Sequence, residues 1–396
     1  MKKFHIIHYC VAILLVGFIA LAGMLTIINL SPRLGARGAD LIRGALGAKP
    51  VADLEEIALN IQDTANKLEF KLGLKTSAAP WQVAAFNPSS AQAPETPQSR
   101  ISDSSKVTRM PSKASWVPSP ISPLGSLDGE GTWSSYIQNA SGDTVAYRTF
   151  LQPDPQRSYA MVAVVAFDLT QSRLHYVIGT NEPAVPIVPK PLGIIPARDR
   201  LVGTLLAAFN GGFKTVNGHY GVMYNNSVLL KPISKIGTVA LYKNGNVRIG
   251  EWGTDMDYTK DMVSFRQNCP LMVHNGVVNP LVYNDSVNDW GGTIRGFVVD
   301  FRSGLGISQD GKTLYYFAGQ NVSMPDLAKA MQDAGAYQAM QLDINSYYVL
   351  FTNFISDNGK LRAQPLLQKG MESNINRFLG PNTGDYFYVT ATNSKL

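Results

Sequence analysis

The chain has 396 residues, of which 45% are hydrophobic and 16% are charged. This length allows one large domain or two ordinary ones, and this hydrophobic content excludes a chain that is disordered throughout. The net charge of +6 comes from scattered Lys and Arg residues. It gives no indication of nucleic-acid binding and predicts only a mild attraction to anionic surfaces or polymers.

The first segment, Phe4–Pro32, contains no Asp, Glu, Lys or Arg. Within it, the 22 residues Tyr9–Leu30 are mostly apolar, which is enough to cross a bilayer as a helix. The small residues of Ala20-Leu21-Ala22 also fit a cleaved signal peptide. Because the apolar run continues past them, we favour an uncleaved anchor over residues 1–32, with the C-terminal domain outside the cytoplasm.

Apolar residues recur at three- and four-residue steps over residues 51–72, which predicts an amphipathic helix. The helix could form a short coiled coil, pack against its own domain or lie on the membrane surface. Residues 76–126 are rich in Pro, Ser, Ala and Gln, which predicts a flexible linker that lets the next domain search a volume near the membrane. Trp81, Phe86 and Trp116 are exceptions in composition and are candidates to dock elsewhere.

Residues 131–396 are predicted to form the main domain. Short apolar runs separated by turn signals predict β-hairpins. A further strand pair is expected between Tyr159–Asp168 and Leu174–Ile178. The hairpin signals are Asn244-Gly245, Asn275-Gly276 and Asp310-Gly311.

One helix of this domain is marked by Ser323 as N-cap, an early Pro325, and Asp326 in position to close a capping box. Many strands and few helices predict an α+β fold with largely antiparallel sheets and a few flanking helices.

The apolar run Leu205–Phe209 predicts a buried strand that ends in Asn210-Gly211-Gly212-Phe213. Two adjacent glycines allow positive φ and a close approach to a ligand, and the N–H groups of such a turn can hold an anion. Asn210 offers both a hydrogen-bond donor and an acceptor. The alternative interpretation is an ordinary tight turn after a core strand.

Three later stretches, 266–276, 291–300 and 339–346, are expected strand ends that present polar groups. In the third, Asp343 follows a short apolar strand, so it could be a general base, a nucleophile or a cation ligand, or it could cap the next turn. His219 lies in a Gly/Asn-rich turn, where it is either functional or simply solvated.

Established metal and nucleophile motifs are absent from the sequence. There is no His-Glu-x-x-His, Gly-x-Ser-x-Gly, Gly-Lys-Ser/Thr phosphate loop or Cys-x-x-Cys. Of the two cysteines, Cys10 lies in the apolar segment. Cys269 is either catalytic or a buried, inert thiol, and we favour the inert thiol. The sequence therefore assigns no metal ligands and leaves any cofactor undetermined.

The order and spacing of these motifs resemble the phosphodiester glycosidase family. The resemblance spans roughly Tyr159–Val389. It rests on Asn210–Phe213, Gly218, Gly221, Gln267, Pro270, Leu271, Val273, Asn275, Gly276, Arg295, Leu342, Asp343, Arg377 and the closing Asp385-Tyr386-Phe387.

The resemblance implies hydrolysis of glycosyl phosphodiesters, with a carbohydrate or sugar-phosphate substrate, and bacterial relatives are often tied to envelope or exopolysaccharide material. It implies that Arg295 and the Gly211–Gly212 backbone bind phosphate, and that Asp343 is the catalytic carboxylate with Asp300 as a possible second one. The implied substrate-binding residues are Asn210, Gln267, Asn275, His219, Asn345 and Ser346.

The chain departs from the family at two places. The family usually has Leu-Asp-Gly-Gly-Gly-Ser where this chain has Leu342–Tyr347, and a second Phe is common where this chain has Lys214. Ile344 is therefore expected to obstruct the approach of substrate to the backbone. This departure motivates an alternative function, a non-catalytic module that binds a glycan or a partner. A third option is a cation-dependent site that uses Asp300 and Asp343.

Overall fold

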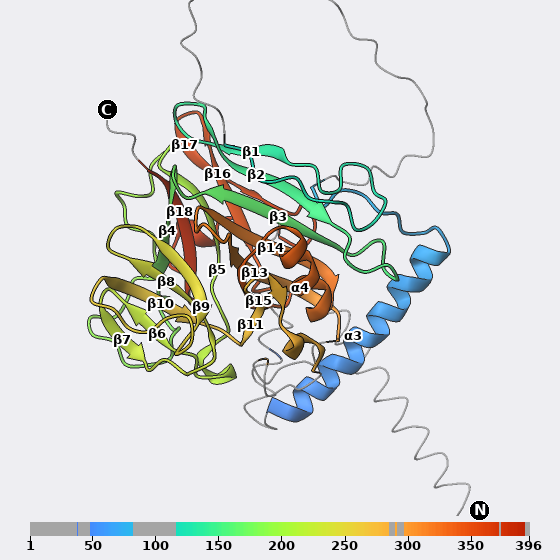
Figure 1. The fold of residues 1–396 in the computed structure, drawn as a ribbon, viewed down its shortest axis with the longest axis horizontal. Helices are drawn as coiled ribbons and strands as arrows, with labels where there is room; N and C mark the ends of the chain where they lie inside the picture. The colour runs from blue at the N-terminus through green and yellow to red at the C-terminus, as the bar shows by residue number, and fades with distance from the viewer. Residues whose placement is uncertain are drawn as a thin grey trace, which may run out of the picture.

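The computed structural model describes Gly38, residues 48–81, 116–284, Trp290, and residues 297–371 and 374–392 (Figure 1). The expected anchor, residues 1–32, lies outside these ranges, as does most of the expected linker. Among the helices that the structure describes, none is both long enough and apolar enough to cross a membrane.

The described strands form three sheets, and every pairing between them is antiparallel. The eight-stranded sheet has the spatial order β1 (Ser134–Gln138), β2 (Thr144–Leu151), β3 (Met161–Asp168), β14 (Thr313–Val322), β13 (Asp300–Ile307), β15 (Gln338–Ile344), β11 (Leu271–His274) and β12 (Val277–Val278). A five-stranded sheet has the order β17 (Lys360–Pro365), β16 (Phe351–Asp357), β5 (Leu205–Asn210), β18 (Tyr386–Ala391) and β4 (Ser172–Val177). The other five-stranded sheet has the order β7 (Ser227–Leu230), β6 (Val222–Tyr224), β10 (Met262–Gln267), β8 (Gly237–Tyr242) and β9 (Val247–Glu251).

The eight-stranded sheet and the β5 sheet face each other across the larger hydrophobic core. Phe209 of β5 lies 4.8 Å from Tyr316 of β14, and Phe351 of β16 lies 5.1 Å from the same tyrosine ring, centroid to centroid. The opposite face of the eight-stranded sheet is covered by α4 (Met324–Asp333), which buries Leu327 and Met331 (Figure 1). The expectation of largely antiparallel sheets with flanking helices is confirmed.

Local turn signals predicted the hairpins correctly. Asn244-Gly245 joins β8 to β9, Asn275-Gly276 joins β11 to β12, and Asp310-Gly311 joins β13 to β14. The expected pair of Tyr159–Asp168 and Leu174–Ile178 is wrong. β3 pairs with β2 and β14, whereas β4 pairs with β18 in the facing sheet. The two strands bury side chains in the same core from opposite layers, so their apolar patterns suit either arrangement.

The capping signal also predicted α4 correctly. The Ser323 side chain accepts from the backbone N–H of Asp326, and the Asp326 carboxylate accepts from the backbone N–H of Ser323. This reciprocal arrangement satisfies two N–H groups that the first helical turn leaves without partners.

The long helix α3 (Ala48–Lys71) occupies the segment that was expected to be helical, and it packs on the domain (Figure 1). Asp63 binds Arg157 with a separation of 2.7 Å, and the Phe70 ring lies 5.3 Å from the Tyr159 ring. Of the three arrangements expected for this helix, the structure therefore shows packing against its own domain.

The described ends of the expected linker both dock on β2. The Trp81 ring lies 5.7 Å from Phe150, and the Trp116 ring lies 5.8 Å from Tyr147. The two described ends of the expected linker therefore lie at one strand. Phe86, the third docking candidate, lies outside the described residues.

Candidate active site

Asn210 ends β5 and joins the two facing sheets. Its amide donates to Gly211 O and to Ser303 Oγ, both at 3.0 Å. Its carbonyl oxygen accepts from the Tyr316 hydroxyl at 3.0 Å and from the Leu350 N–H at 3.2 Å. The donors and acceptors that were expected to orient a sugar thus bond within the protein.

Gly211 and Gly212 follow Asn210, but neither has the positive φ that was expected. A Cβ on Gly211 would lie 2.7 Å from Asp385 O, and a Cβ on Gly212 would lie 2.9 Å from Asn268 Oδ1. The N–H of Gly211 donates to Asp385 O at 3.1 Å. Glycine is required at both positions because the chain passes close to buried polar groups.

Beneath this turn lies a buried ion pair. Arg266 Nε donates to Asp385 Oδ2 at 2.6 Å, and the Tyr176 hydroxyl donates to the same oxygen at 2.7 Å. Arg266 also donates to the backbone carbonyls of Phe213 and Gln267. Burial alone would lower the pKa of Arg266, but Asp385 and Tyr176 outweigh burial and raise it. The guanidinium therefore remains charged.

Gln267 and Asn268 extend this scaffold in different directions. Gln267 is fully buried and bonds to Gly221, Ile233 and Thr238, so its amide is used within the protein rather than at an open site. Asn268 accepts from the Phe213 N–H at 3.0 Å and donates to the backbone carbonyls of β15 just before Asp343. It therefore fixes the distance between the Asn210–Phe213 turn and Asp343.

A β-bulge aims Asp343 at this scaffold. Arg302 of β13 pairs with Ile344, and Gly304 pairs with Gln341. The two partners are three residues apart in β15 but two residues apart in β13, so β15 contains one extra residue at this point. Such an extra residue reverses the alternation of side chains between the two faces. Gln341 and Ile344 therefore point to the α4 side, whereas the Asp343 carboxyl has Asp385, Lys214 and Arg266 as its charged neighbours.

The Asp343 carboxyl is half-buried, and its Oδ1 accepts from the Ile344 N–H at 2.8 Å. Burial, with a smaller contribution from Asp385, raises its pKa to about 8, against the opposing effects of this N–H, Lys214 and Arg266. An acid with such a pKa changes charge near neutral pH, which is a common property of catalytic groups.

This raised pKa predicts a pH-dependent stability. The ordinary pKa of the carboxyl is 3.8, so between pH about 4 and about 8 the folded state binds more protons than the unfolded state. The free energy of unfolding should therefore fall as pH rises through this window and level off above it. Urea unfolding of the native protein and of Asp343→Asn across this range would measure the effect. Above pH about 6, the pKa of Asp300, that second carboxyl no longer changes the free energy of unfolding with pH. In this range the free energy of unfolding should fall for the native protein but not for the variant. If the free energy of unfolding fell equally with pH in both proteins, the raised pKa could not belong to Asp343.

The residues after Asp343 correct the expectation about Ile344. The Ile344 side chain is 7% exposed and packs in the core under α4, so it does not obstruct the site. Asn345 takes the left-handed conformation with φ 80°, which a glycine would also adopt, and its Oδ1 accepts from the Tyr347 N–H at 3.0 Å. Ser346 is half-buried in the same turn.

Two cations and two aromatic rings border Asp343. Lys214 Nζ lies 4.9 Å from the centroid of the Tyr348 ring, and Arg377 Cζ lies 5.0 Å from that of Tyr347. The two tyrosine rings are 5.0 Å apart and nearly perpendicular. Burial lowers the pKa of Arg377, while Tyr347 and Asp343 oppose this effect. The cluster thus combines an accessible carboxyl, two positive charges and two apolar ring faces.

Other predicted residues lie elsewhere. Asn275 is an exposed turn residue bonded to Gln338, and Gln338 begins β15 at about 16 Å from Asp343 along the strand. Burial raises the pKa of Asp300 to about 6, and its charged neighbours are Arg302 and Glu55, so it does not pair with Asp343. His219 is exposed, with its N–H bonded to Thr215 O. Arg295 lies outside the described residues.

Sequence reasoning gave no role to Arg266, Asn268, Lys214, Arg377 or Asp385. A signal for the ion pair was present, because Arg266 and Asp385 are charges beside strongly apolar strands and a buried charge requires a partner. The other three had no such signal, because their partners are set by tertiary contacts. Arg377 entered only through the family resemblance, and Lys214 only as a departure from it.

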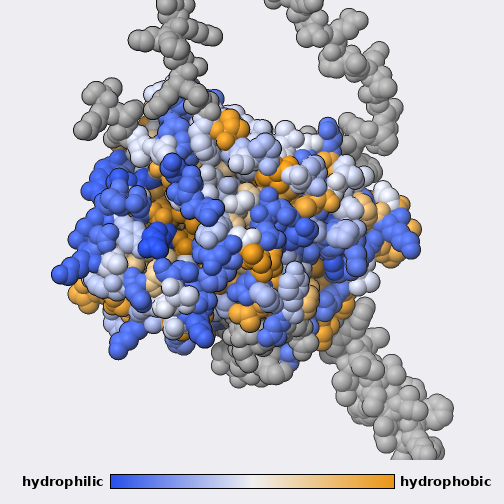
Figure 2. Space-filling model, in the orientation of Figure 1, coloured by the Kyte–Doolittle hydropathy of each residue, from blue (hydrophilic) through white to orange (hydrophobic). Residues whose placement is uncertain are grey.

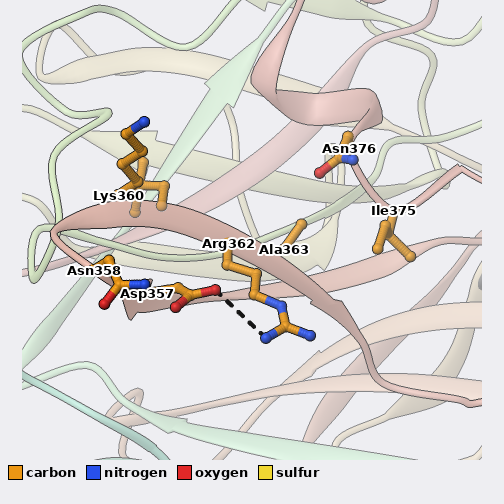
Figure 3. A pocket seen from close by; sticks show the side chains of 8 residues that line it. Asp357, Asn358, Lys360, Arg362, Ala363, Ile375 and Asn376 are labelled. Carbon is orange, nitrogen blue, oxygen red and sulfur yellow. Dashed lines mark ion pairs between the residues drawn. The ribbon is translucent and has the colours of Figure 1, made fainter.

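A separate cavity of about 520 Å³ lies along the β16–β17 hairpin (Figure 3). None of its lining residues belongs to the cluster around Asp343, and Arg362 points toward Asp357 at 3.5 Å. The lining consists of Asp357, Asn358, Lys360, Leu361, Arg362, Ala363, Ile375 and Asn376. This cavity is open and its charged side chains are exposed, unlike the half-buried Asp343 carboxyl.

One protein-family model matches part of the chain. Residues 203–378 match the phosphodiester glycosidase family model, a range that includes Asn210, Asp343 and Arg377. A search of curated proteins finds no match.

Several solved structures are similar to the chain, among them the following two. The zebrafish N-acetylglucosamine-1-phosphodiester alpha-N-acetylglucosaminidase catalytic domain, auto-inhibited by pro-peptide, is 16% identical, with a TM-score of 0.42 over 66% of this chain and 88% of that one. A hypothetical protein from Synechocystis is 10% identical, with a TM-score of 0.30 over 66% of this chain and 62% of that one.

Proposed function

We propose that this chain, whose residues 203–378 form a phosphodiester glycosidase family domain, is a hydrolase that cleaves glycosyl phosphodiesters at the anomeric carbon. The observation that carries the proposal is the half-buried Asp343 carboxyl with Lys214 and Arg377 beside it. A sugar phosphate requires positive charge for its phosphate and a carboxylate for its anomeric centre.

In the proposed reaction, the bond between the anomeric carbon and the phosphate oxygen breaks. The phosphate monoester leaves with the bonding electron pair, and a water oxygen bonds to the carbon. Because this leaving group is already acidic, little general-acid assistance is needed. Ionised Asp343 stabilises the positive charge that develops at the anomeric carbon and takes the proton of the attacking water. Activity should therefore rise with pH through the pKa of Asp343.

Lys214 and Arg377 are proposed to bind the phosphate, while Tyr347 and Tyr348 provide apolar ring faces for the sugar. Asn210, Gly211, Gly212 and Asn268 then act by positioning. This division supports a two-part site in which charge selects the phosphodiester and ring faces accept the sugar.

Lys214→Met tests the phosphate contact. The variant should weaken binding of a sugar 1-phosphate about tenfold, because a charge-assisted hydrogen bond is lost, and should leave binding of the neutral methyl glycoside unchanged. Isothermal titration of the full-length protein in detergent would measure both ligands. Lys360→Met, on the separate cavity, is the matched control. Equal losses for both ligands would show that Lys214 supports the fold rather than the phosphate.

The location is part of the proposal. The apolar segment Phe4–Pro32 supports an anchored protein whose catalytic domain faces outward, toward envelope or exopolysaccharide material. Full-length protein should release sugar from a sugar-1-phosphodiester in a panel of gluco- and N-acetylglucosamine derivatives. The alternative, a non-catalytic module, predicts saturable glycan binding with no release at any pH. A buried Ile344 gives that alternative no support.

A further inference from the structure

A line of buried side chains connects β14 to the backbone of Asp343. The Tyr316 hydroxyl donates to Asn210 Oδ1, and Asn210 Nδ2 donates to Ser303 Oγ, both at 3.0 Å. The Ser303 hydroxyl then donates to the backbone carbonyl of Asp343 at 2.7 Å. Residues of β14, β5 and β13 are thus joined to β15 by three successive hydrogen bonds, called here the Ser303 network.

The direction of each hydrogen bond in the Ser303 network is fixed by its ends. The Leu350 N–H can only donate, and it donates to Asn210 Oδ1 at 3.2 Å, which identifies the oxygen end of this amide. The NH₂ end therefore faces Ser303, whose oxygen accepts, so the Ser303 proton remains for the Asp343 carbonyl. Because hydrogen bonds aligned in one direction polarise one another, this carbonyl is held more firmly than by an isolated hydroxyl.

The members of the Ser303 network are buried. Hydrophilic side chains cover much of the surface in Figure 2, where water can bond to them, but Ser303 and Tyr316 are 0% exposed and Asn210 is 5% exposed. A polar group that loses its partner in such a place is costly, so the backbone around it moves toward another donor. Loss of the Ser303 hydroxyl should therefore shift the backbone at Asp343.

Ser303 acts at the bulge that aims Asp343. It lies between the two β13 residues whose partners in β15 are three residues apart, so it stands opposite the extra residue. A bulge disrupts the regular ladder of hydrogen bonds, and side chains can supply bonds in its place. Asn268 holds the two carbonyls just before Asp343, and Ser303 holds the carbonyl of Asp343 itself. The conformation of the bulge thus depends on two side chains.

We infer that Ser303 is a positioning residue for the proposed reaction. Its hydroxyl, which Asn210 orients, fixes the backbone of Asp343 so that the carboxyl faces the two cations of the site. This role rests on the proposed function, because it acts through the carboxyl that the reaction uses. Tyr316 contributes less, since the Leu350 N–H bonds to the same Asn210 oxygen without it.

Ser303→Ala in the full-length protein in detergent tests this role. The substitution removes only the hydroxyl, so Asp343 can move while the cations that bind phosphate stay in place. Displacement of a catalytic group by about 1 Å costs on the order of 10²-fold in rate. For a sugar-1-phosphodiester, kcat should therefore fall by about 10²-fold while KM changes little.

Thr238→Val is the matched control. Thr238 is also 0% exposed, and its hydroxyl donates to Ile236 O and accepts from the Gln267 amide, both at 3.0 Å. It has the same kinds of partner as Ser303, but it lies on β8 in the sheet that does not contain Asp343. This variant should lose stability but keep the native kcat.

The pH dependence of unfolding gives a second measurement, which needs no catalysis. The charged neighbours of the Asp343 carboxyl are Asp385, Lys214, Arg266 and Arg377. Burial raises its pKa to about 8, so the free energy of unfolding of the native protein should fall between pH about 6 and about 8. If Ser303→Ala lets the carboxyl reach water, its pKa returns toward 3.8 and this fall should largely disappear. Thr238→Val should keep the native fall.

Tyr316→Phe tests the same network if Ser303→Ala does not fold. It keeps the ring contacts with Phe209 and Phe351 and should change kcat and the pH dependence in the same direction, by less. A variant of the network that matches Thr238→Val in both measurements would overturn the inference and leave the proposed function intact. If the native protein releases no sugar, the proposed function is lost, and a native fall of the unfolding free energy in Ser303→Ala or Tyr316→Phe would still overturn the positioning of Asp343.

Discussion

Asp343→Asn should lower kcat/KM for a glycosyl phosphodiester by about 10³-fold while the protein stays folded. The substitution keeps the size of the side chain and its acceptance from the Ile344 N–H, but it removes the charge that the anomeric centre needs. Because the lost interaction exists mainly in the transition state, kcat should fall and KM should change little. Sugar release and circular dichroism of the purified full-length variant would measure both properties.

Asp300→Asn is the matched control for this variant. Asp300 is also a half-buried strand carboxyl with a raised pKa, and its Oδ1 accepts from the next backbone N–H at 2.7 Å. Its charged neighbours are Arg302 and Glu55 rather than Lys214 and Arg266, so its replacement should leave turnover close to native. Full turnover by Asp343→Asn would remove Asp343 from the mechanism, and an equal loss in Asp300→Asn would show that the assay does not separate the two carboxyls.

The parts of the fold that the sequence predicted are those that depend on neighbouring residues. Asn-Gly and Asp-Gly turns determine hairpins through their own backbone preferences, and Ser323 with Asp326 determines a helix start within four residues. The pairing of β3 could not be predicted in this way. Its partner β14 lies about 150 residues away, and an apolar strand suits many partners.

The candidate site was predictable to a similar extent. Asp343 follows a short apolar strand, a local pattern, and the sequence identified it as a candidate. Its orientation depends on a bulge opposite β13, and its neighbours Lys214 and Arg377 come from distant turns. Asn210 and Gln267 were also predicted as site residues. Both are polar residues at strand ends, but their amides bond within the protein, and only the tertiary structure reveals those partners.

Asp385→Asn should cost about 3 kcal/mol of unfolding free energy, because removing one member of a buried ion pair leaves the other charge without its counter-ion. Arg266 and Asp385 have side chains that are 5% and 4% exposed, and Arg266 has no second carboxylate bonded to it in the described part of the chain. The backbone carbonyls of Phe213 and Gln267 would still accept from the guanidinium but could not neutralise it. Urea unfolding at neutral pH would give the difference.

Two comparisons make this result interpretable. Asp357→Asn removes one member of the exposed pair with Arg362, whose side chains are 49% and 62% exposed, and should cost at most about 1 kcal/mol. Asp385→Asn combined with Arg266→Met removes the buried charge along with its partner, so much of the lost stability should return. If the double variant is as unstable as Asp385→Asn alone, an uncompensated guanidinium is not the cause of the lost stability. The cause would then be the turn at Gly211, which donates its N–H to Asp385 O and packs closely against Asp385.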